Sequence, residues 1–87
     1  MKLTQLMSDL VKRNGSDLHL TGNSIPFFRV QGQIVPADSE IFSSEDLKDQ
    51  LTKILGIEKM VNFEKEKELD CSYGLKGIAR FRINIFF

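Results

Sequence analysis

The last quarter of the chain alternates between polar and apolar side chains, and this pattern restricts the fold to one that contains a two-faced sheet. Residues 68–73 place a leucine, a cysteine and a tyrosine on one side. Residues 80–87 place phenylalanine and isoleucine on one side, with two arginines and an asparagine on the other. A period of two is typical of a strand with one buried face. Residues 74–77 (GLKG) separate the two segments, so we expect a hairpin.

Other periodicities predict three further strands and three helices. Apolar residues at helical spacing favour a first helix that ends at Asn14-Gly15, a second from Ser43 or Ser44 to Gly56, and a short third one over 57–63. Alternation and turn residues favour strands at 16–20, 27–31 and 33–35. The order is therefore α-β-β-β-α-α-β-β. It indicates an α+β domain with an antiparallel sheet and helices packed on one face.

Length and charge narrow the class of protein. The chain has 87 residues, enough for a single domain over 1–87, and its 12 basic and 12 acidic side chains leave no net field for nucleic acid or an anionic membrane. A lone cysteine fits a reducing, cytoplasmic setting. No run approaches the roughly 18 apolar residues needed to cross a bilayer. The strand-like ending at Phe87 has no polar tail, so we expect a fragment of a longer protein.

Motifs for independent catalysis are absent from the sequence. It contains no P-loop, so the chain alone is not expected to hydrolyse a nucleotide. One histidine and one cysteine far apart do not suggest a metal site. His19 with Asp17 and Ser16 does not amount to a catalytic triad, because nothing in the sequence indicates an oxyanion hole. We therefore expect no catalytic residue and no metal ligand in the chain itself.

Arg80, Arg82 and Asn84 point from the same side of the last strand. Two neighbouring guanidinium groups repel each other and need an anion between or beside them. Glu68 and Asp70, on the polar side of the preceding strand, can supply it across the hairpin. A bound phosphate or carboxylate is the alternative. Spacing alone favours the internal pairing, and one further arginine, on the strand over 27–31, adds little to the choice.

Four segments resemble one family. Gly15–Leu20 (GSDLHL), Pro26–Gly32 (PFFRVQG), Glu68–Tyr73 (ELDCSY) and Gly77–Asn84 (GIARFRIN) resemble motifs of the PilT-type ATPases, which retract type IV pili in twitching motility. The four occur in the family's order and span nearly the whole chain. Together they are more specific than any one of them.

The resemblance implies a PAS-like N-terminal domain of a secretion-superfamily ATPase. A RecA-like domain would follow it and carry the P-loop, and ATP with Mg²⁺ would lie in the cleft between the two domains. Neither ligand is expected on the isolated chain. Arg80 and Arg82 would then contact the nucleotide phosphates, with Arg29 and Asn84 as possible accessory residues. Phosphoryl transfer needs positive charge at this place, so the resemblance reverses the preference for internal pairing.

The resemblance also implies partners. They are the chain's own RecA-like domain, neighbouring subunits of a hexamer and the pilus platform protein of the inner membrane, at whose cytoplasmic face the assembly would sit. The domain would form one wall of the ATP cleft and a packing surface between subunits. The alternative is a free-standing PAS-like sensory or protein-interaction module. Nucleic-acid binding through Arg29, Arg80 and Arg82 is disfavoured by the neutral net charge.

Overall fold

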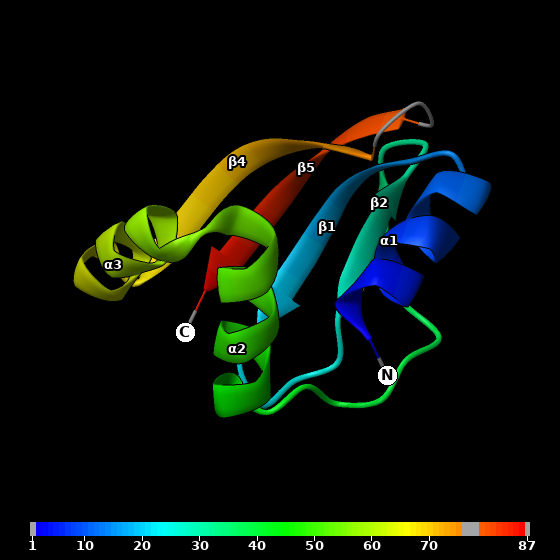
Figure 1. Ribbon diagram of the computed structural model, residues 1–87. Helices are drawn as coiled ribbons and strands as arrows, with labels where there is room; N and C mark the ends of the chain where they lie inside the picture. Colours follow the sequence, from blue (N-terminus) through cyan, green and yellow to red (C-terminus); the bar gives the residue numbers. More distant parts are fainter. Residues whose placement is uncertain (1, 76–78, 87) are drawn as a thin grey trace.

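A five-stranded sheet carries three helices against one of its faces (Figure 1). The computed structural model describes residues 2–75 and 79–86. The elements are α1 (Leu3–Lys12), β1 (Gly15–Thr21), β2 (Phe27–Val30), β3 (Gln33–Pro36), α2 (Ser44–Leu55), α3 (Ile57–Glu66), β4 (Glu68–Leu75) and β5 (Ala79–Phe86). The α+β class and the order of elements confirm the prediction.

The sheet is mixed rather than wholly antiparallel. Its strand order is β3-β2-β1-β5-β4, and β5 runs parallel to β1, with Leu18 opposite Ile83. The other three pairs are antiparallel. The difference arises from the long connection through α2 and α3, because a crossover of that length can return the chain to the far side of β1 in the same direction as β1. The pairing of β1 with β5 thus brings an early and a late segment of the chain side by side.

The alternation in the last strands is confirmed by burial. Phe81, Ile83 and Ile85 are buried, whereas Arg80 and Arg82 are exposed. The buried strand residues meet the apolar sides of the helices in one cluster. It comprises Leu3, Leu6, Met7, Leu10, Leu18, Leu20, Phe28, Ala37, Phe42, Leu47, Leu51, Met60, Phe63, Phe81, Ile83 and Ile85. The charged face of the last strand therefore points away from the helices.

The second helix begins and ends where the sequence predicts. The Ser43 hydroxyl oxygen accepts a hydrogen bond from the backbone N–H of Asp46 at 3.1 Å, which satisfies one free donor of the first turn. Gly56 ends α2 with a φ of 94°. α3 follows immediately and buries Met60 and Phe63. None of the helices among the described residues has both the length and the apolar content to cross a membrane.

The first helix ends slightly differently from the prediction. Asn14, with a φ of 57°, makes the left-handed turn, and Gly15 is already the first residue of β1. Glycine favours a close approach there, because a Cβ atom would press against the side chain of the buried Leu10. The predicted end of the helix at Asn14-Gly15 is therefore confirmed, but Asn14 makes the turn and Gly15 begins the strand.

The two hairpins differ in how much of the turn is described. β2 and β3 are joined by Gln31 and Gly32, whose φ angles of 50° and 79° fit the type I′ turn that suits a two-residue hairpin. For the β4–β5 hairpin, residues 74 and 75 of the predicted turn belong to β4. Residues 76 and 77, like Phe87 on the predicted apolar side of β5, lie outside the described residues.

Candidate functional site

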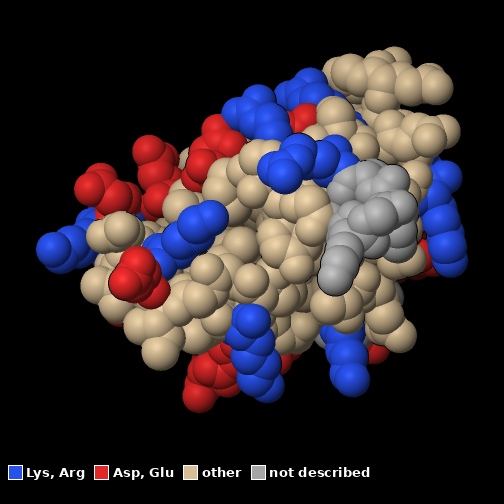
Figure 2. Space-filling view, turned by 45° about the horizontal axis from the view of Figure 1, so that its top comes forward, with Lys and Arg blue, Asp and Glu red and all other residues tan. Residues whose placement is uncertain are grey.

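The side of the sheet that faces away from the helices carries most of the candidate residues, and we call it the open face. Strand alternation and pairing bring these side chains to it, among others: Asp17, His19, Phe27, Arg29, Glu68, Asp70, Ser72, Arg80, Arg82, Asn84 and Phe86. In Figure 2, basic side chains (blue) and acidic side chains (red) lie interspersed on the side of the molecule that is shown. The open face is therefore a mixed-charge surface rather than a purely basic one.

A carboxylate lies between two arginines at the centre of this face. Asp17 on β1 is the register partner of both Arg29 on β2 and Arg82 on β5. The Nε atom of Arg29 lies 3.8 Å from Oδ2 of Asp17, and the Nε atom of Arg82 lies 3.9 Å from Oδ1. Strands are about 5 Å apart, so three neighbouring strands form this row. The two positive charges are held near each other because a negative charge separates them.

Asp17 is the charged residue with the least exposure among those that the structure describes, at 6%. The hydroxyl of Ser16 donates a hydrogen bond to Oδ2 of Asp17 at 2.6 Å. A carboxylate that loses water requires hydrogen bonds and opposite charges in exchange. Ser16 and the two arginines supply both, so Asp17 is a fixed part of the sheet.

Arg82 has a second acidic partner on its other side. Its Nη2 donates a hydrogen bond to Oδ2 of Asp70 on β4 at 2.5 Å. This bond raises the pKa of the Arg82 guanidinium above its ordinary value, and the charges of Asp70 and Asp17 raise it further. The internal pairing that the sequence allowed is thus formed by Asp70. Glu68, the other candidate, lies opposite Phe86 in the register.

Arg80 and Arg82 share the open face but have different surroundings. Nη1 of Arg80 donates to the hydroxyl of Ser72 at 3.2 Å, a neutral partner. Its guanidinium lies over Gly74, where a Cβ atom would be 3.6 Å from Nη2. Within the described residues, Arg80 has no carboxylate at ion-pair distance. Arg80 therefore keeps a positive charge that none of the described carboxylates neutralises.

The two accessory candidates are separated by the structure. Arg29 joins the central row and also donates from Nη1 to the carbonyl of Gly32 at 3.1 Å. Asn84 lies in the register between His19 and Asp70. It lines a shallow hollow of about 340 Å³ together with the acidic side chains of residues 66, 68 and 70. Arg29 is thus well placed beside Arg82, whereas Asn84 faces carboxylates.

Several known proteins are similar to this chain in sequence and in fold. No protein-family model matches the chain. The type IV pilus retraction ATPase PilT of Pseudomonas aeruginosa is 30% identical over 86 residues, which are 99% of this chain and 25% of that protein. The type IV pilus ATPase PilU of the same organism is 25% identical over the whole chain and 23% of its own length. The crystal structure of the pilus retraction motor PilT with bound ADP superposes with a TM-score of 0.69 at 25% identity, covering 99% of this chain and 25% of that one.

Sequence and fold agree along the whole chain. Over almost its whole length the chain is similar to the PilT-type ATPases. The chain spans about a quarter of the length of the relatives it matches. The similar region includes the strands that carry Asp17, Arg29 and Arg82, so the central row lies within it.

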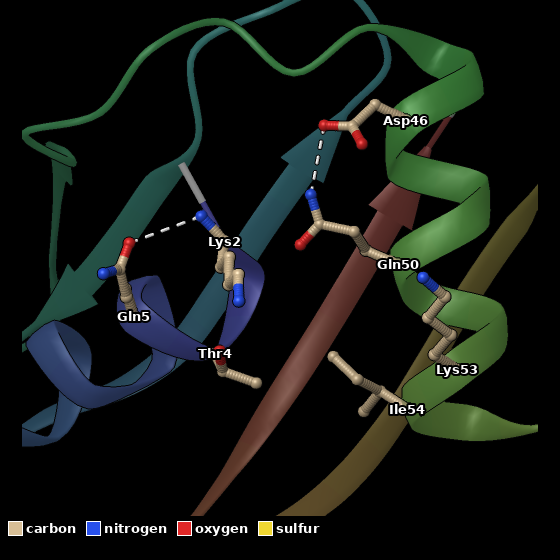
Figure 3. Close-up of a pocket in the computed structure, with 7 residues that line it drawn as sticks. All are labelled: Lys2, Thr4, Gln5, Asp46, Gln50, Lys53 and Ile54. Carbon is tan, nitrogen blue, oxygen red and sulfur yellow. Dashed lines mark hydrogen bonds between the residues drawn. The ribbon is translucent and has the colours of Figure 1, made fainter.

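The domain also has a groove between α1 and α2, on the helical side (Figure 3). Its volume is about 810 Å³. Oε1 of Gln50 accepts a hydrogen bond from the backbone of Leu3, and Nε2 of Gln50 donates to Asp46. Among the residues that the structure describes, no three side chains of the metal-binding types converge on one point. The groove is thus larger than the hollow on the open face, but its polar groups bond to each other.

Cys71 is part of the packing, as its alternation predicts. It is half-buried against the core. Burial raises the pKa of its thiol, and the positive charge of Lys59 offsets part of that effect. A thiol with a raised pKa is a weak nucleophile at neutral pH. A structural role follows, although the nearby cation was not expected from the sequence.

Sequence reasoning gave Asp17 no role, and this is the main residue that it missed. Asp17 and His19 were placed on one strand face, but their neighbours could not be known. The parallel pairing of β1 with β5 brings Asp17 beside Arg82. A signal was available in the serine–aspartate pair at the start of β1, since an acidic residue flanked by a hydroxyl donor suits burial.

The buried carboxylate leads to a stability prediction. Replacing Asp17 by asparagine should lower the free energy of unfolding by about 1–3 kcal/mol, because the ion pairs are lost while both arginines remain. The loss stays within this range because both arginines are partly in water, which weakens their ion pairs. Urea unfolding measures the change. Asp49→Asn, an exposed carboxylate on α2, is the control and should change stability by less than about 0.5 kcal/mol. Equal stability of both variants would contradict the role of Asp17.

Proposed function

We propose that this chain is the PAS-like N-terminal domain of a hexameric ATPase that retracts type IV pili. In this proposal the open face forms one wall of a cleft in which a RecA-like domain binds ATP. Two relatives are named as type IV pilus ATPases and a solved relative as a pilus retraction motor, which supports the proposal. The chain corresponds to a quarter of those proteins, so it would supply only part of the active site.

One observation carries the phosphate contact. Arg80 and Arg82 lie on the side of the sheet away from the helices, and both are exposed. Two guanidinium groups on one strand face can each donate several hydrogen bonds to phosphate oxygens. Negative charge spreads over those oxygens in the transition state of phosphoryl transfer, where such donors stabilise it. Arg82 and Arg80 would therefore act on the triphosphate, with Arg29 as a neighbouring charge.

Other parts of the proposal come from the resemblance. Mg²⁺ and the P-loop would belong to the RecA-like domain, and this domain would add positive charge and one wall of the cleft. Neighbouring subunits and the pilus platform protein at the inner membrane would be its partners, in the cytoplasm. The exposed Ile57 and Val61 on α3 are apolar side chains that such subunit packing could cover.

A specific observation also supports the second candidate, a PAS-like interaction module. Phe27 and Phe86 are exposed on the open face, on the two strands that carry the arginines of the central row. Exposed aromatic side chains on a sheet favour contact with another protein. Both proposals use the same face, and they differ in whether a nucleotide lies against it.

The gene sequence beyond the codon for Phe87 and an ATPase assay distinguish the two proposals. Reading the gene beyond the codon for Phe87 should reveal a P-loop in the same reading frame. The complete product should then hydrolyse ATP, whereas the 87-residue chain alone should not. A gene without a P-loop, or a complete product that neither binds nor hydrolyses ATP, would refute the motor proposal and leave the interaction module.

A further inference from the structure

We propose that Asp70 is a displaceable counter-ion of Arg82, and that Asp17 is the fixed anchor of the same arginine. In the free domain Asp70 neutralises the guanidinium. When a polyphosphate is brought to the open face, Arg82 exchanges Asp70 for the phosphate and keeps Asp17. The inference rests on the proposed function and adds a means of regulating the same site.

The exposure of the two carboxylates distinguishes their roles. The Asp70 side chain is 52% exposed, whereas that of Asp17 is 9% exposed. Water can therefore replace Arg82 at Asp70 at little cost, as is usual for surface ion pairs. At Asp17, release of the arginine would leave a buried charge with one partner fewer, which is costly. The Arg82–Asp70 bond is the one that yields first.

The contacting atoms also differ between the two pairs. Asp70 binds Nη2, at the outer end of the Arg82 side chain, by a direct hydrogen bond. Asp17 lies near Nε, at the inner end, at 3.9 Å. An arginine can thus turn its outer nitrogens toward a new anion while Nε stays beside Asp17. The inner end of the Arg82 side chain thus stays at Asp17, while the contact at its outer end can be exchanged.

The charges give a direction to the exchange. Among the described ion pairs, Arg29 and Arg82 face Asp17 and Asp70, and Arg80 beside them adds a positive charge whose hydrogen-bond partner is the neutral Ser72. Asp70 competes with an incoming phosphate for the same guanidinium. A phosphate can accept more hydrogen bonds and carries more charge than a carboxylate, so it can win once it is held nearby. Without Asp70, the same anion should bind more tightly.

The test measures binding of inorganic tripolyphosphate to the 87-residue chain by NMR titration at low salt. Asp70→Asn should increase the affinity by roughly 3–10-fold, because the competing charge is removed while the side-chain shape is kept. Glu68→Gln is the matched control: it makes the same charge change two residues away on the same strand face, opposite Phe86 rather than an arginine. It should raise the affinity by less than about twofold.

A double-mutant cycle shows whether the gain passes through Arg82. In an Arg82→Ala background, Asp70→Asn should change the affinity by less than about twofold. Equal gains in both backgrounds, or equal gains from Asp70→Asn and Glu68→Gln, would reduce Asp70 to a general charge and overturn the proposal. No binding by any variant would overturn it too. The motor proposal would survive these outcomes, since its test is ATP hydrolysis by the complete gene product.

Discussion

Replacing Arg82 by alanine in the complete ATPase should slow ATP turnover by roughly 10–1000-fold without unfolding the domain. The reason is electrostatic: Arg82 is exposed on the open face and would place charge where negative charge develops in the transition state. Arg80→Ala should have an effect in the same range, since Arg80 has no carboxylate partner in the described residues. Steady-state ATP hydrolysis at saturating ATP measures both.

Two further variants make the result interpretable. Lys53→Ala removes one positive charge from the groove between α1 and α2, on the helical side, and should leave turnover within about twofold. Arg82→Lys keeps the charge but loses the two-pronged donor, so it should recover only part of the activity. Thermal melting of each variant checks the fold. Normal turnover in both Arg80→Ala and Arg82→Ala would end the phosphate-contact proposal.

Replacing Phe81 by alanine should lower the free energy of unfolding by about 3–5 kcal/mol. Phe81 lies on the same strand as the two arginines but on the opposite face, and it is 3% exposed. Its ring packs against that of Tyr73, with centroids 6.0 Å apart. Loss of the ring would leave a cavity between sheet and helices, which the fixed strands cannot close. Urea or thermal unfolding of the 87-residue chain measures the loss.

Phe86 offers the matched control for this prediction. It is the same residue type on the same strand, but it points to the open face and is 48% exposed. Phe86→Ala should therefore cost less than about 1 kcal/mol. If the two variants unfolded at the same urea concentration, the assignment of the faces of β5 would be wrong.

The elements themselves could be predicted from local patterns. Alternation in residues 80–86 gave the buried and polar sides of β5, and Ser43 and Gly56 marked the ends of α2, because these signals act within a few residues. Strand partners could not be predicted in this way. The neighbour of β1 on the β5 side is decided by the long connection over residues 37–67, and local periodicity carries no information about its end point.

At the candidate site, too, local patterns predict some features and only the tertiary structure determines others. Arg80 and Arg82 share a face because they are two residues apart, which the sequence states directly. The position of Asp17 between Arg29 and Arg82 depends on two separate strand pairings, one antiparallel and one parallel. The choice of Asp70 over Glu68 as the partner of Arg82 depends on side-chain reach across the hairpin. The chemistry of the site was thus visible in the sequence, and its geometry came from tertiary structure.

The parallel contact between the first and last strands has a consequence for the order of assembly. Asp17 and Arg82 are 65 positions apart, and contacts between such distant residues form slowly because a large loop must close first. During synthesis, the helices and the β2–β3 hairpin can form while β1 still has one open edge. Only the arrival of β5 covers that edge and creates the arginine–aspartate row. The complete charged row therefore forms only when the sheet is complete. A nascent chain without β5 lacks both the finished sheet and the full row.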